Sequence, residues 1–119
     1  MPNWSVIEAS FLNLPQAQQL GELAASLARL NSWSQKSVSQ EVVPVLLDES
    51  LLYLSLIQRE SQINIELDQL LGLLQGWKQN WLNIWNNSNE TANIADIASS
   101  WSQRILAMSG LLTSESMSA

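Results

Sequence analysis

One stretch, residues 63–85, constrains the fold of this chain more than any other. Its large apolar residues recur at alternating spacings of four and three, which is the repeat of an α-helix. They are Ile63, Leu67, Leu70, Leu74, Trp77, Trp81 and Ile84, flanked by Leu71, Leu73, Leu82 and Trp85. Together they cover about half of the helix circumference, which is too much for a lone surface helix. We therefore predict one continuous helix that packs against several neighbours.

Four other segments carry helical patterns with recognisable ends. Ser5 and Glu8 have the spacing of a capping box, and Pro15 and Pro44 suit the first turn of a helix, where a missing N–H costs little. Gly110 is a natural helix terminator. The predicted helices run from Ser5 to about Asn13, from Pro15 to about Asn31, from Pro44 to about Glu60 and from about Glu90 to Ser109. A helix that is kinked at Pro44, instead of starting there, stays open as an alternative. Residues 32–42, which include Trp33, read as a connection, and 61–64 as a short break.

These helices and their short links define the expected fold. Wide apolar faces with no alternating strand pattern predict an all-α protein, an antiparallel up-down bundle of four main helices with a short N-terminal helix. We expect residues 1–112 to form a single helical-bundle domain. The small, polar residues 113–119 are expected to be a disordered C-terminal tail.

Composition argues against several classes of function. The chain has no cysteine and no histidine, so it lacks thiolate and imidazole metal ligands, the cysteine nucleophile and the commonest general base. Its net charge is −6, and its few basic residues are scattered singly, so no nucleic-acid or membrane partner is predicted. We see neither a membrane span nor a secretory signal, and we expect a cytoplasmic, non-enzymatic protein without a cofactor.

Two glycines stand on the side of the central helix opposite its apolar residues. Each glycine inside a helix costs about 1 kcal/mol relative to alanine, so close approach of a second backbone would explain them. The predicted interface consists of Ile65, Gln69, Gly72, Gly76, Asn80 and Asn83. Two alternatives stay open: a helix that bends or ends at this point, and simple tolerance of a weak helix.

A ladder of tryptophans is the second candidate site. Trp77, Trp81 and Trp85 lie one turn apart, and Trp101 could join them from the last helix. Such a wall suits a flat apolar or aromatic ligand. The alternative is that these side chains simply fill the core, with their N–H groups bonded at its edge.

Carboxylates are the only residues that suggest catalysis. Helical hydrolases can hold Mg²⁺ with carboxylates one turn apart on facing helices. The candidates here, however, stand one or two residues apart and point to different sides. No catalytic or metal-binding residue is therefore predicted, although the residues considered are Asp48, Glu49, Glu60, Glu66, Asp68 and Asp96.

Three pieces of the chain, at 17–30, 40–50 and 101–112, look like small uncharacterised helical proteins of cyanobacteria. They read AQQLGELAASLARL, QEVVPVLLDES and WSQRILAMSGLL, and they cover about a third of the chain. The resemblance implies a cytoplasmic bacterial protein and brings no activity with it.

Three hypotheses of function follow in order of preference. The first is a protein-interaction or assembly subunit, which binds either itself as a homodimer or a different protein. The second is a carrier of an apolar or aromatic small molecule, and the third is a carboxylate and Mg²⁺ enzyme.

Overall fold

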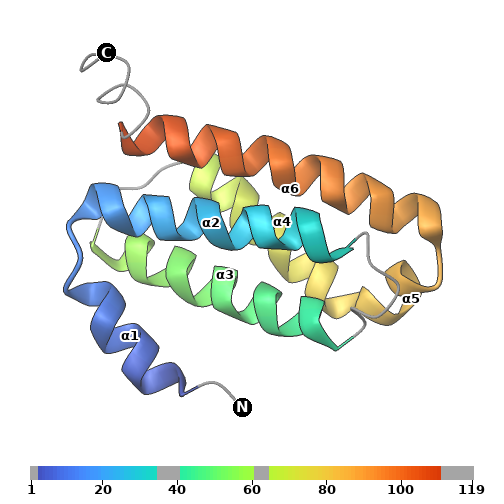
Figure 1. Ribbon diagram of the computed structural model, residues 1–119, viewed down its shortest axis with the longest axis horizontal. Helices are drawn as coiled ribbons and strands as arrows, with labels where there is room; N and C mark the ends of the chain where they lie inside the picture. Colours follow the sequence, from blue (N-terminus) through green and yellow to red (C-terminus); the bar gives the residue numbers. More distant parts are fainter. Residues whose placement is uncertain (1–2, 35–40, 61–64, 111–119) are drawn as a thin grey trace.

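The computed structural model describes residues 3–34, 41–60 and 65–110, and the regular structure of these residues is helical (Figure 1). The all-α prediction is therefore confirmed. The helices are α1 (Trp4–Leu12), α2 (Gln16–Ser34), α3 (Val42–Glu60), α4 (Ile65–Gln79), α5 (Trp81–Trp85) and α6 (Ser88–Ser109). The predicted break at 61–64 and the predicted tail at 113–119 lie outside the described residues.

Helix starts differ from prediction by a few residues. The capping residue of α1 is Asn3, whose side chain accepts a hydrogen bond from the Val6 N–H (3.2 Å), so the helix begins before Ser5. Asparagine is as good an N-cap as serine, and here it stands two residues earlier. Helix α3 begins two residues before Pro44, which still lies in the first turn, where no N–H partner is needed.

The end of α2 and both ends of α6 show the same local rules. Helix α2 continues to Ser34, past the predicted end, and brings half-buried Trp33 against the core. Asn87 caps α6 by accepting from the N–H groups of Asn89 (3.0 Å) and Glu90 (3.4 Å). As predicted, Gly110 ends α6 in the left-handed conformation, with φ of 79°.

The prediction of a continuous helix over 63–85 is wrong at Asn80. Its backbone (φ −106°, ψ 13°) leaves the helical region and separates α4 from α5. The Asn80 backbone N–H and side-chain amide both donate to the Gly76 carbonyl, at 3.1 and 2.9 Å. Asparagine side chains compete in this way for backbone partners and disturb helix interiors. Leu82, predicted to belong to the apolar half, lies beyond the break and is 68% exposed.

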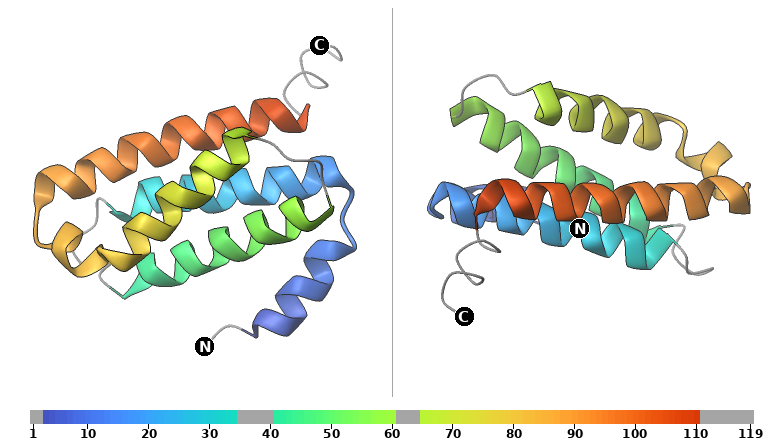
Figure 2. Two further views of the ribbon diagram at one scale, coloured as in Figure 1. Left: turned by 180° about the vertical axis from the view of Figure 1, so that it is seen from behind. Right: turned by 90° about the horizontal axis from the view of Figure 1, so that it is seen from above.

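Helices α2 and α6 lie side by side along most of their length (Figures 1 and 2). Two buried alanines, Ala24 and Ala98, allow the backbones to come close. Side chains then bond directly to the backbone of the other helix: the Ser102 hydroxyl donates to the Ala24 carbonyl and the Asn31 amide to the Ala95 carbonyl, both at 2.7 Å. Among the described helices, this pair shares the most extensive contact.

Helix α4 crosses this pair on a diagonal, on the side that faces away from the viewer in Figure 1 and toward the viewer in the left view of Figure 2. At its start, Glu66 pairs with Arg104 of α6 at 2.9 Å, and at its end Lys78 pairs with Asp48 of α3. The helix thus starts beside the C-terminal half of α6 and finishes beside the N-terminal half of α3. Exposed pairs of this kind contribute at most about 1 kcal/mol each, so they orient the helices more than they stabilise them.

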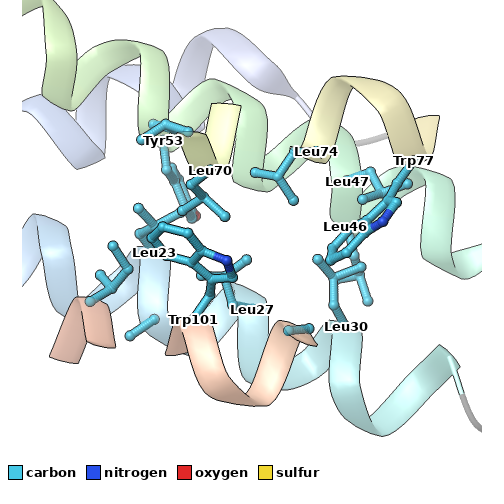
Figure 3. Close-up of a cluster of buried hydrophobic side chains, with 14 of the residues drawn as sticks. Leu23, Leu27, Leu30, Leu46, Leu47, Tyr53, Leu70, Leu74, Trp77 and Trp101 are labelled. Carbon is cyan, nitrogen blue, oxygen red and sulfur yellow. The ribbon is translucent and has the colours of Figure 1, made fainter. Parts of the chain in front are cut away.

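One hydrophobic core lies between α2, α3, α4 and α6 (Figure 3). Leucines from three helices form its centre; Leu23, Leu27, Leu54, Leu70 and Leu74 are fully buried. None of the described helices is both long and apolar enough to cross a membrane.

A buried polar contact crosses this core and gives a test of the fold. The hydroxyls of Ser26 and Ser50 lie 2.8 Å apart, and both side chains are fully buried. We expect Ser26→Ala or Ser50→Ala alone to lower the free energy of unfolding by about 1–3 kcal/mol, because each leaves one hydroxyl unsatisfied. The double variant should lose less than the sum of the two. Urea unfolding of all four proteins measures this, and additive losses would show that the hydroxyls do not interact.

Candidate functional site

A surface groove opens between α4, α5 and the start of α6. Its volume is about 500 Å³. We call it the α4–α6 groove; its lining residues are Gly72, Leu73, Gly76, Trp77, Asn80, Asn83, Ile84, Glu90, Asn93 and Ile94. Two other hollows on the described part of the chain have volumes of about 310 and 450 Å³.

The groove exists because α4 diverges from α6. The two helices are joined near the start of α4, where Arg104 bonds Glu66 and also lies over the ring of Trp101, 3.9 Å from its centroid. From there the diagonal course of α4 carries its last two turns toward α3 (Figure 2). The N-terminal half of α6 is therefore left without α4 beside it.

The groove has an apolar floor and a polar rim. Trp77, Ile84 and Ile94 are 8%, 7% and 3% exposed, so little of each side chain reaches solvent. The exposed lining residues are mostly amides, and Glu90 is the one charged side chain among the residues that line the groove. The groove therefore presents both polar and apolar surface to a ligand, and it offers little for acid–base chemistry.

Gly72 and Gly76 form the α4 edge of the groove. A Cβ atom built on either glycine would meet nothing within 4 Å outside its own helix turn. No contact within the described residues therefore requires a glycine at these positions. Gly76 lies one turn before the end of α4, so the alternative of a helix that ends applies to it; Gly72 lies a full turn earlier, in regular helix.

The structure brings together most, but not all, of the predicted interface. Gly72, Gly76, Asn80 and Asn83 line the groove. Ile65 and Gln69 are exposed on the same face of α4, nearer its start, and lie outside the groove. The lining residues that the sequence did not single out are Leu73, Ile84, Glu90, Asn93 and Ile94. Whether these residues line the groove depends on how α4 crosses α6, and no local sequence pattern predicts that crossing.

The four tryptophans that were predicted to line one pocket lie in different surroundings. Trp81 and Trp85 contact each other, with ring centroids 5.6 Å apart and planes tilted by 47°. Trp77 lies beside Leu46 and Leu47, whereas Trp101 lies at the other end of the core beside Leu23 and Leu70 (Figure 3). Of these four rings, Trp77 lines the α4–α6 groove and Trp81 lines a neighbouring hollow next to Pro44 and Leu82.

A smaller hollow of about 310 Å³ lies under α1. Phe11 stacks on Tyr53 there, with centroids 4.4 Å apart and planes 7° from parallel. Burial raises the pKa of the Tyr53 hydroxyl, and the nearby Glu49 and Glu22 raise it further. This tyrosine therefore stays protonated at neutral pH and does not serve as a base.

The candidate carboxylates are spread over several helices, and four of them contact side chains of another helix. Asp48 pairs with Lys78, Glu49 with Arg29 and Glu66 with Arg104. Asp68 accepts from the Gln58 amide at 2.7 Å, and Asp96 is exposed. Within residues 3–34, 41–60 and 65–110, no three such side chains gather closely enough to hold a metal ion.

No family model matches the chain, and no curated protein or solved structure does either. The resemblance to small helical proteins of cyanobacteria stays a prediction. Function must therefore be inferred from the geometry of the described residues.

The open space at Gly72 predicts a gain in stability on substitution. Gly72→Ala should raise the free energy of unfolding by about 0.5–1 kcal/mol, because alanine is the better helix former and its methyl group meets no neighbour. Gly110→Ala is the matched control and should lower it by about 1 kcal/mol, because its positive φ strains any side chain. Urea unfolding checks both, and a destabilised Gly72→Ala would mean that this face is packed.

Proposed function

We propose that this protein is a non-enzymatic interaction subunit that binds another polypeptide through the α4–α6 groove. One observation carries the proposal: Gly72 and Gly76, where an added Cβ atom would meet nothing within 4 Å, border a groove whose deepest residues, Trp77, Ile84 and Ile94, are apolar. Glycine weakens α4, and no contact within the described chain makes up for it. Because the glycines have no side chains, the backbone of a partner helix could come close to α4 at these positions.

The partner expected from this geometry is an amphipathic helix. Helix-in-groove recognition buries apolar anchors one or two turns apart in a hydrophobic channel. Here the floor of Trp77, Ile84 and Ile94 would receive such anchors, and the amides of Asn80 and Asn93 would bond at the rim. We expect the partner helix to lie along Gly72 and Gly76, because glycine permits close backbone contact.

We also propose the finer architecture in which α2, α3, α4 and α6 form an antiparallel up-down bundle in one domain. The alternating directions of these four helices in Figure 1 support it. In a regular bundle each helix packs on two neighbours. The diagonal of α4 leaves one of these four contacts incomplete, and the docked helix would complete it.

Other properties of the proposal rest on composition and charge. The absence of cysteine suits a reducing cytoplasm, where we place the protein. The ion pairs of Asp48, Glu49 and Glu66 with basic side chains favour a structural role for these carboxylates over catalysis.

The groove can be tested with a photo-crosslinking amino acid, placed at Asn83 in the intact chain and expressed in the cells of origin. Asn83 is exposed at the groove. We expect irradiation to join it to a polypeptide and give one product of defined mass. Gly76→Leu in the same chain should reduce that product at least about tenfold, which corresponds to about 1.4 kcal/mol, because leucine obstructs the approaching backbone.

Gln75 supplies the matched controls for this experiment. It is exposed on the same helix but outside the groove. The crosslinker placed at Gln75 should give no such product, and Gln75→Leu should leave the Asn83 product unchanged. Failure of Asn83 to form any protein adduct, or an adduct indifferent to Gly76→Leu, would refute docking in the groove.

A small-molecule carrier is the second candidate, because Trp77 lines the groove and its volume lies within the range of ligand sites. It predicts that an apolar aromatic compound changes tryptophan emission and that Trp77→Phe removes most of the change. Fluorescence titration with a panel of such compounds checks this. Emission that is indifferent to the whole panel would exclude the carrier.

A further inference from the structure

Helix α1 is anchored to the other helices through its last turn. Phe11 is its buried residue; the ring stacks on Tyr53 of α3, and the Phe11 carbonyl accepts from the Gln19 amide at 3.2 Å. Toward its start α1 diverges from α3 (Figures 1 and 2), and Val6 is 59% exposed. The divergence leaves the hollow of about 310 Å³ under α1, which we call the α1 hollow.

The lining of the α1 hollow combines apolar side chains with a few polar ones. This combination is typical of small-molecule sites, in which apolar surface holds the body of a ligand and polar groups fix its orientation. The volume suits a compound the size of one aromatic ring with a short side chain. The apolar lining residues are Val6, Ile7, Phe11 and Leu14, and the polar ones are Ser10, Glu22 and Tyr53.

The hydroxyl of Tyr53 is the observation that points to a ligand. The side chain is 8% exposed, and within the described part of the chain no hydrogen bond involves its hydroxyl. Burial raises the pKa of this hydroxyl, and Glu49 and then Glu22 raise it further, so the oxygen lies near the Glu22 carboxylate that lines the same hollow. Buried polar groups are almost always hydrogen-bonded. A ligand in the hollow can supply the missing partner.

The charge at the hollow is negative and uncompensated. Glu49 forms an ion pair with Arg29 at 2.5 Å, so these two charges offset each other. Glu22 is exposed and has no ion-pair partner among the described residues, and the residues found to line the hollow include no basic side chain. A cation is therefore the charge that fits beside Glu22.

We propose that the α1 hollow binds a small organic ammonium ion with an apolar body. The ammonium group donates to the Glu22 carboxylate and to the Tyr53 hydroxyl oxygen, while the apolar body lies against Val6, Ile7 and Leu14. A carboxylate ligand would be repelled at the same position. The site is separate from the α4–α6 groove, so this inference does not depend on the function proposed for that groove.

Three compounds of similar shape and different charge test the proposal on the full chain. They are phenethylamine, which is cationic at neutral pH, the neutral phenethyl alcohol and the anionic hydrocinnamate. We expect phenethylamine to shift the amide resonances of Ile7, Ser10 and Glu22 in heteronuclear NMR titrations. Its affinity should exceed that of hydrocinnamate by at least about tenfold, because attraction to Glu22 is replaced by repulsion.

Two carboxamide variants isolate the role of the carboxylate. Glu22→Gln should lower the affinity for phenethylamine at least about threefold and leave that for phenethyl alcohol unchanged, because Glu22 is exposed and contributes through its charge. Glu90→Gln is the matched control, since it removes the same charge from the α4–α6 groove and should change neither affinity.

Tyr53→Phe isolates the role of the hydroxyl. It should lower the affinities for phenethylamine and for phenethyl alcohol alike, because both bond to the phenol. The urea midpoint should stay equal or rise, since the hydroxyl has no partner in the described chain to lose. A lower midpoint would show that the hydroxyl is already bonded within the protein and would overturn its role as a ligand group.

The titrations have further outcomes that would overturn the proposal. Resonances of the α1 hollow that do not respond to phenethylamine would exclude the site. Equal binding of the cation and the anion, or an affinity for phenethylamine that is indifferent to Glu22→Gln, would exclude recognition of an ammonium group.

Discussion

The close contact between α2 and α6 is the constraint from which the rest of this structure follows. Alanines at the contact bring the two backbones together, and Asn31 and Ser102 bond across it to backbone carbonyls. Such bonds hold one register, because a slide along the helix would leave a buried carbonyl and an amide or hydroxyl without partners. The pair therefore serves as a fixed base on which α3 and α4 are arranged.

Ion pairs at its two ends orient α4 on the α2–α6 pair. Arg104 holds its start at α6, with the guanidinium spanning both Glu66 and the ring of Trp101, and Asp48 of α3 holds its end through Lys78. Trp77 and Trp101 lie at opposite ends of the core (Figure 3). Between these two points the buried residues Leu67, Leu70, Leu74 and Trp77 pack α4 on the core along its diagonal course, and the groove is the space that this crossing leaves.

Local features of the fold were predictable from the sequence, and crossing angles were not. Helical periodicity, the asparagine run before α6 and the stop at Gly110 act through neighbours in the chain, so the sequence displays them. The sequence analysis missed the break at Asn80 because the buried residues Trp77, Trp81 and Ile84 keep helical spacing across it. The Ile84 N–H still bonds the Asn80 carbonyl. The signal of this break was an asparagine four residues after a glycine. The glycine face was visible in the sequence, but its α6 partners, Asn93 and Ile94, depend on tertiary geometry.

The two glycines connect this geometry to function through free energy. A domain of this size has a total stability of about 5–15 kcal/mol, so two glycines that each weaken α4 by about 1 kcal/mol remove a substantial part of it. Packing within the described chain does not explain them, because the space beside both is open. In the proposed complex, the backbone of a docked partner would occupy that space and offset the loss. The proposed docking would therefore explain both the glycines of α4 and the incomplete contact between α4 and α6, which packing within the described residues leaves unexplained.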